Sequence, residues 1–136
     1  MVYGLIMYES TTRNIRVIVK PQYLEEQSKP DENYFVWAYR IVIENNGDET
    51  VRLNRRYWEI TDSAGRVQEV RGAGVVGEQP RLKPGESFEY TSGAPLATAS
   101  GFMSGCYYMQ NANGEEFDVQ IPGFALDQPH SNKALH

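Results

Sequence analysis

Residues 34–45 read YFVWAYRIVIEN, and they carry the clearest structural signal in the chain. The large apolar residues of this stretch, which occupy every second position, are Phe35, Trp37, Tyr39, Ile41 and Ile43. This period-two alternation is typical of a β-strand that buries one face in a hydrophobic core. The positions between these residues are partly apolar as well, so we expect this strand to lie in the middle of a sheet.

Shorter alternations of the same kind, separated by turn residues, lie on both sides of this strand. The other expected strands contain Ile15 to Val19, ending at Pro21, then Val51 to Ile60, Val67 to Val70, Phe88 to Tyr90, Gly101 to Gln110 and Phe117 to Ile121. Turns are expected at 45–48, 62–65, 82–85 and 113–114, with a polar loop at 27–33. Apart from a turn near 23–27, no stretch shows helical periodicity. About seven strands at this spacing predict an all-β fold, an immunoglobulin-like or fibronectin type III-like antiparallel β-sandwich, with a closed barrel as the alternative.

One expected strand changes its alternation halfway. Val51 and Leu53 share one parity, whereas Trp58 and Ile60 have the other. A regular strand directs alternate side chains to opposite faces, so it cannot bury both pairs. We therefore predict a β-bulge, a kink or a strand break near residues 54–56.

The composition is that of one globular domain. The chain has 136 residues, of which 40% are hydrophobic and 12% aromatic, enough for a single core. We expect the domain to span residues 1–128, with a flexible polar tail at 129–136. The start, from Met1 to Met7, lacks the basic region and cleavage site of a signal peptide, and no apolar run is long enough to cross a membrane. A cytoplasmic location is therefore expected, and the single cysteine, Cys106, agrees with it.

The charge distribution argues against nucleic acid as a partner. The formal net charge is −5, whereas nucleic-acid binding requires basic residues that neutralise phosphates. The charge is uneven, however, because residues 52–83 hold seven basic and four acidic side chains. We interpret this local excess of positive charge as scattered surface charge. The alternative interpretation is a surface that attracts anions.

Residues 72–77 read GAGVVG and match the G-x-G-x-x-G pattern of dinucleotide-binding loops. In such folds the loop opens a helix whose N-terminus holds the pyrophosphate. Here Pro80 and Pro84 follow, and no helix can run through them. We therefore reject a nucleotide-binding fold and expect NAD, ATP and GTP to bind no more tightly than about millimolar. A weaker interpretation remains, in which backbone N–H groups of the loop hold a small anion such as phosphate or pyrophosphate. The residues of this candidate anion-binding loop are Arg71, Gly72, Gly74, Gly77 and Arg81.

No residue set for metal binding or catalysis is evident. The only histidines, His130 and His136, lie in the expected tail, whereas a structural zinc site needs four N or S ligands. Without a histidine in the body of the domain, neither a serine nor Cys106 has a general base, and Cys106 is interpreted as a packing residue. We therefore predict no catalytic residues, no metal site and no cofactor, and we expect a protein that is not an enzyme.

Several motifs resemble those of the bacterial ApaG family, also called CorD. They are Ala38-Tyr39-Arg40, Glu44 to Gly47, Trp58 to Asp62, Glu69 to Pro80, Leu82 to Glu86, Tyr90 to Leu96 and Ile121 to Phe124. The resemblance covers nearly the whole chain, and the stretch from Val70 to Pro80 is its most specific part. It implies a fibronectin type III-like sandwich and an association with cobalt resistance and magnesium efflux. Related domains inside eukaryotic proteins, including an F-box protein and a polymerase-associated protein, imply an interaction module.

Two positions depart from the family pattern. Many relatives have histidine where this chain has Tyr57, and cysteine where it has Ala94. If either side chain binds a metal in the family, this chain lacks that ligand.

Together these features predict a binding domain. The leading hypothesis is a non-enzymatic module that binds a protein partner in the setting of divalent-cation homeostasis. The alternative is the anion-binding loop at residues 72–77, and an enzyme of unknown class ranks last. We expect a monomer or a weak homodimer, with no membrane insertion and no nucleic-acid partner. Tyrosine and tryptophan side chains on the outward parity of the strands would suit a protein interface.

Overall fold

The structure, a computed structural model, describes residues 6–129 of the chain. Within this range the chain forms nine β-strands and two short 3₁₀ helices. The strands are β1 (Tyr8–Thr12), β2 (Ile15–Tyr23), β3 (Phe35–Asn45), β4 (Val51–Asp62), β5 (Val67–Ala73), β6 (Arg81–Leu82), β7 (Ser87–Leu96), β8 (Ser100–Asn111) and β9 (Glu116–Asp127). The helices are η1 (Glu25–Gln27) and η2 (Pro30–Glu32). Residues 1–5 and the segment 130–136 of the expected tail lie outside the described range.

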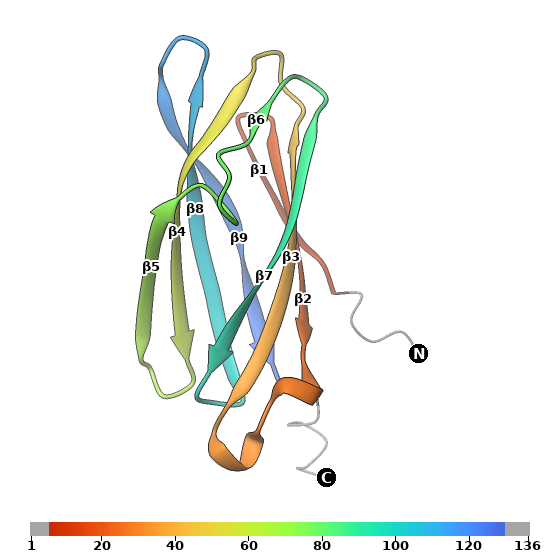
Figure 1. The fold of residues 1–136 in the computed structure, drawn as a ribbon, viewed down its shortest axis with the longest axis vertical. Helices are drawn as coiled ribbons and strands as arrows, with labels where there is room; N and C mark the ends of the chain where they lie inside the picture. The colour runs from red at the N-terminus through yellow and green to blue at the C-terminus, as the bar shows by residue number, and fades with distance from the viewer. Residues whose placement is uncertain (1–5, 130–136) are drawn as a thin grey trace.

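Two antiparallel sheets pack face to face (Figure 1). One sheet has the order β1-β2-β3-β7, and the other has the order β5-β4-β8-β9 with β6 also paired to β4. This arrangement confirms the predicted fibronectin type III-like sandwich and not the closed barrel. Residues 6–129 form nine strands, which adds β1 and β6 to the approximately seven expected from the sequence. Both are short and hold too few apolar residues for an alternation to show in the sequence.

The strand β3 lies in the centre of the first sheet, as its alternation predicts. Its inward side chains are buried, and Ile41 and Ile43 are completely inaccessible to solvent. Across the sandwich, the ring of Tyr39 has its centroid 5.3 Å from that of Trp58 and 6.1 Å from that of Phe124. Within the second sheet, Phe124 packs edge-on against Trp58 at 5.9 Å. Such aromatic pairs contribute roughly 0.5–1.5 kcal/mol each beyond the burial of their area. The core therefore joins β3, β4 and β9 and fixes the two sheets against each other.

The prediction that the first strand ends at Pro21 is wrong, because β2 continues to Tyr23. The N–H of Leu24 donates to the carbonyl of Val36. Since hydrogen-bonded pairs alternate along an antiparallel ladder, the nitrogen of Pro21 points away from β3. On that other side β1 reaches only as far as Val19. The missing N–H of proline therefore removes no ladder bond, which is the condition under which a strand tolerates proline.

The predicted irregularity in the strand from Val51 to Ile60 is confirmed as a β-bulge in β4. The pairing between β4 and β8 shifts its register between Leu53 and Arg55. The extra residue switches the parity, so the apolar side chains before the bulge and those after it, such as Trp58, are all buried. The bulge also allows one edge of β4 to take two partners, β6 before it and β5 after it.

In the part of the chain that the structure describes, helical structure is limited to the connection between β2 and β3, in agreement with the expected all-β fold. The helices η1 and η2 contain three residues each. Within residues 6–129, no helix has the length and apolar character that are needed to cross a membrane.

Candidate functional site

The strand β5 forms an open edge of the second sheet. It pairs with β4 on one side and has no strand of residues 6–129 on the other. Five of its seven residues are exposed, and only Val70 and Gly72 are partly covered. Natural sheets often protect an edge with proline, a bulge or a covering loop. The sequence of β5, VQEVRGA, contains no proline, and its pairing with β4 is regular, so this edge is available for pairing.

Two hydrogen bonds at the ends of β5 determine where its backbone groups point. The N–H of Asp62 donates to the carbonyl of Arg66, and the N–H of Gly74 donates to the carbonyl of Asn54. When the register of the β4–β5 ladder is extended to both ends, each of these bonds joins two directly opposed residues, and all of these residues are even-numbered. Because hydrogen-bonded pairs alternate in an antiparallel ladder, the even-numbered residues of β5 face β4 and the odd-numbered residues face away from it.

The backbone N–H and C=O groups of Val67, Glu69 and Arg71 therefore point to the open edge. Alternate residues of a strand are about 6.8 Å apart, so these groups form a regular row. The backbone groups of Ala73 also point away from β4, but its carbonyl accepts a hydrogen bond from Nη1 of Arg56 at 3.2 Å. Such a row is a template onto which one more strand can be added.

A groove of about 400 Å³ lies beside the first half of β5 and is lined by residues of both sheets. Its lining includes Tyr34, Ile60, Val67, Pro95 and Leu96. Tyr34 is 44% exposed and Val67 is 57% exposed, although both are large and apolar. The groove therefore offers apolar contacts to side chains of any segment that pairs with this edge.

The outer face of β5 carries a polar cluster around Tyr57. The guanidinium of Arg71 lies 4.4 Å from the centre of the Tyr57 ring. The hydroxyl of Tyr57 is 2.6 Å from Glu69 Oε2 and 3.1 Å from Glu59 Oε2. The hydrogen bond to Glu69 is the main cause that raises the pKa of Tyr57 above its ordinary value. Tyr57 therefore stays protonated and separates two carboxylates that face each other across the ladder.

The predicted glycine loop forms a tight turn that closes on itself. The N–H of Val75 donates to the carbonyl of Glu78 and the N–H of Glu78 to the carbonyl of Val75, at 2.8 and 2.9 Å. The two residues between them, Val76 and Gly77, have φ angles of 44° and 79°, as in a type I′ turn. Gly74 also has a positive φ, of 58°. Because the N–H groups of Gly74, Val75 and Glu78 donate to carbonyls of the protein, the glycines here shape a turn.

Gly72 lies directly against the guanidinium of Arg56. A Cβ atom at Gly72 would be 2.8 Å from Nη1 of Arg56. The same nitrogen donates to the carbonyls of Ala73 and Gly74, at 3.2 and 2.9 Å. Arg56 thus ties the end of β5 to β4, a role that sequence reasoning missed. The only signal for it was an arginine next to a predicted bulge.

The two arginines of the predicted anion-binding loop do not come together. Arg71 lies opposite Tyr57 in the β4–β5 ladder, whereas Arg81 lies opposite Arg52 in the β4–β6 ladder. This separation along β4 corresponds to roughly 17 Å. Arg71 belongs to the polar cluster around Tyr57 on the outer face of β5. Arg81 follows the turn at residues 75–78 and lies on the other side of the bulge in β4.

Among residues 6–129, no three His, Cys, Asp or Glu side chains come together in a way that could hold a metal ion. The histidines His130 and His136 lie outside the described residues. Burial raises the pKa of the Cys106 thiol above its ordinary value, which lowers its reactivity. The hydroxyls of Tyr90 and Tyr107 contact each other at 2.5 Å in the core, and burial raises the pKa of both. None of these groups is a nucleophile paired with a general base.

The chain resembles known proteins over most of its length. A family model described as the ApaG domain matches residues 25–111. "Protein ApaG" of Parvibaculum lavamentivorans is 61% identical over 130 residues, which cover 96% of this chain and 100% of that relative. "Protein ApaG" of Rhodospirillum centenum is 64% identical over 124 residues, covering 91% and 95% of the two chains. The crystal structure of the putative ApaA protein from Bordetella pertussis superposes with a TM-score of 0.82 and 47% identity, covering 91% of this chain and 98% of the other. The chain therefore belongs to the ApaG family, as the sequence motifs predicted.

Proposed function

We propose that this ApaG domain is a non-enzymatic binding module, which takes up an extended segment of a protein partner along the open edge of β5. The observation that carries this proposal is the row of outward backbone groups at Val67, Glu69 and Arg71. Strand addition at such an edge gains affinity from main-chain hydrogen bonds and specificity from pockets for alternate side chains. The groove beside the edge provides the pocket.

The side chains along this edge suggest what kind of segment fits. At its first half, Val67 and the groove residues Tyr34 and Leu96 favour an apolar side chain on the partner. Further along, Glu69 and Arg71 carry opposite charges on exposed positions. A matching segment therefore has an apolar residue that enters the groove and charged residues beyond it.

The family resemblance supplies the proposed setting. We place the module in the bacterial cytoplasm, in the context of cobalt resistance and magnesium efflux. It acts there by binding another protein and does not itself move ions or catalyse a reaction. In the free state it is a monomer or a weak homodimer.

Photo-crosslinking in cells tests this proposal. A photoreactive amino acid at Val67 is expected to capture one partner protein in a bacterium that lacks its own ApaG. Adding Glu69→Pro is expected to reduce the captured amount at least about tenfold, because proline removes an outward N–H and places a ring on the edge. The bonds to β4 stay intact, since the backbone of Glu69 does not face that strand.

The matched control is Glu69→Ala, which removes the same carboxylate and its bond to Tyr57 but keeps the N–H. This variant is expected to capture the partner as the parent protein does and to restore cobalt tolerance, whereas Glu69→Pro does not restore it. Equal capture by the folded proline and alanine variants would contradict strand addition at β5.

A further inference from the structure

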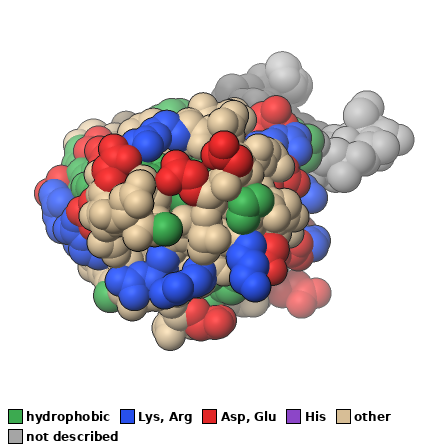
Figure 2. Space-filling model, turned by 90° about the horizontal axis from the view of Figure 1, so that it is seen from above, with side chains coloured by type: hydrophobic (Ala, Val, Ile, Leu, Met, Phe, Trp, Pro, Cys, Tyr) green, Lys and Arg blue, Asp and Glu red, His purple; other side chains and the backbone are tan. Residues whose placement is uncertain are grey.

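Three basic side chains lie together on the outer face of the sheet where β6 meets the start of β4. They are Arg52, Arg81 and Lys83, and among residues 6–129 none of them forms an ion pair with a carboxylate. Leu82, between the last two, points into the core, so its neighbours both face outward. Figure 2 looks down on this end of the molecule and shows a row of Lys and Arg side chains along its lower part.

Arg52 and Arg81 lie directly opposite each other in the β4–β6 ladder. The N–H of Leu53 donates to the carbonyl of Pro80, so the next pair, Arg52 and Arg81, is the non-hydrogen-bonded one in which side chains approach most closely. Like charges placed opposite each other destabilise a sheet. A bound anion would relieve the repulsion between these two arginines.

A depression of about 510 Å³ lies at these three side chains. Its other lining residues are Thr50, Val51, Gln110, Asn111, Ala112 and Gly114. No carboxylate lines it, although the protein as a whole has a net charge of −5. Gln110 lies opposite Arg52 on the neighbouring strand β8. The depression therefore combines three cations with neutral hydrogen-bonding groups.

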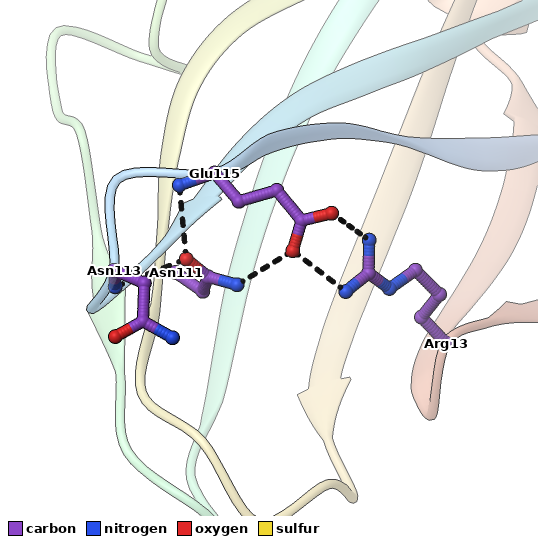
Figure 3. A network of polar contacts seen from close by, with 4 residues as sticks. All are labelled: Arg13, Asn111, Asn113 and Glu115. Carbon is purple, nitrogen blue, oxygen red and sulfur yellow. Dashed lines mark hydrogen bonds and ion pairs between the residues drawn. The ribbon is translucent and has the colours of Figure 1, made fainter.

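Two acidic residues of the β8–β9 hairpin beside the depression are paired with other arginines. Figure 3 shows Glu115 reaching from the β8–β9 hairpin to Arg13, at 3.1 Å, while its other contacts go to Asn111. The hydrogen bond from Arg13 lowers the pKa of Glu115, so this pair is ionised at neutral pH. Glu116 binds Arg55 at 2.7 Å. These pairs hold the hairpin that forms the wall of the depression.

The Glu86 carboxylate accepts from the backbone N–H of Lys83 at 2.8 Å, and Nε of Arg52 donates to the neutral amide of Asn54 at 2.7 Å. The three cationic side chains still have no ion-pair partner among residues 6–129.

We propose that this depression binds a compact phosphate anion with several charges, of which pyrophosphate is the simplest example. The planar guanidinium groups of Arg52 and Arg81 form paired hydrogen bonds to phosphate oxygens, and Lys83 adds a point charge. Of the residues predicted for an anion-binding loop, Arg81 belongs to this site, whereas the glycines at 72–77 lie on the other side of the bulge.

Titration with pyrophosphate, followed by NMR at constant ionic strength, tests the proposal. Saturable shifts are expected at the amides of Thr50, Arg52, Arg81 and Gln110, with an affinity at least about fivefold above that of inorganic phosphate. Arg52→Gln and Arg81→Gln are each expected to weaken binding at least about fivefold. Pyrophosphate should also raise the melting temperature of the parent protein but not of these variants.

Lys20→Gln is the control, because it removes one exposed positive charge from the other sheet. It is expected to change the pyrophosphate affinity less than twofold. Both arginine variants should fold, because their removal relieves repulsion, and melting curves without ligand establish this. Shifts that do not saturate, shifts centred on residues 72–77, or an equal loss of affinity in Lys20→Gln would each overturn the proposal.

Discussion

Replacing Gly74 with valine is expected to reduce the free energy of unfolding by about 3–4 kcal/mol. Gly74 has a φ of 58°, and a Cβ atom there would lie 2.0 Å from the carbonyl oxygen of Glu78. The positive φ alone costs roughly 1–2 kcal/mol for a residue with a side chain. The overlap also forces Glu78 to move, which breaks its two bonds to Val75, at about 1 kcal/mol each. Thermal melts should show a midpoint lowered by roughly 10 °C.

Gly77→Val is the matched control within the same turn. Gly77 also has a positive φ, of 79°, but nothing lies within 4 Å of a Cβ built there. Only the backbone strain remains, so a loss of about 1–2 kcal/mol is expected. If the valine variants of Gly74 and Gly77 melted at the same temperature, steric contact with Glu78 would not be the reason that Gly74 is required.

Replacing Asn45 with alanine is expected to have the second large effect, also about 3–4 kcal/mol. Asn45 is only 1% exposed. Its side-chain amide donates to the carbonyls of Glu49 and Leu82, at 2.7 and 2.9 Å, and its oxygen accepts from the N–H of Gly47 at 3.0 Å. Alanine removes all three bonds and, of these partners, Leu82 is buried whereas Glu49 and Gly47 are accessible to water. The cost is about 1–3 kcal/mol for a group that water does not reach and less for the others. Chemical denaturation of both proteins measures the difference.

Asn111→Ala provides the comparison for Asn45. Asn111 makes a similar set of contacts, because its oxygen accepts from the N–H groups of Asn113 and Glu115. Asn111 is also buried, at 8% exposed, but Asn113 and Glu115, whose N–H groups it binds, lie in an exposed hairpin. Water replaces the lost bonds there, so a smaller loss of about 1–2 kcal/mol is expected. If both alanine variants lost the same free energy of unfolding, burial of the hydrogen-bond partners would not be the reason for the large effect at Asn45.

The sequence predicts most of the sandwich, because its strongest signals come from strands that bury one face. The alternation from Phe35 to Ile43 identified β3, and the change of parity between Leu53 and Trp58 identified the bulge. The same reasoning could not find β1, since YESTT has no apolar alternation and is held by pairing with β2. Pro21 is tolerated inside β2 because no neighbouring strand needs its N–H. The local sequence does not show which strands are neighbours.

The candidate sites were harder to predict, because both depend on which strands are neighbours. The exposed strand β5 looks in the sequence like any polar strand, and only the sheet order shows that its edge is open. Arg52 and Arg81 are far apart along the chain, and the bulge brings β6 opposite the start of β4. The glycine motif drew attention to residues 72–77, but a local pattern cannot show that the N–H groups of such a loop already have partners.

Hydrogen exchange along β5, in the free protein and with the captured partner, tests strand addition most directly. In the free protein the amides of Gln68 and Val70 should exchange slowly, because they face β4, while those of Glu69 and Arg71 exchange fast. With the partner bound, strand addition at β5 predicts that exchange at Glu69 and Arg71 slows at least about tenfold. Unchanged fast exchange at these two amides in the complex, with new protection elsewhere on the protein, would contradict it.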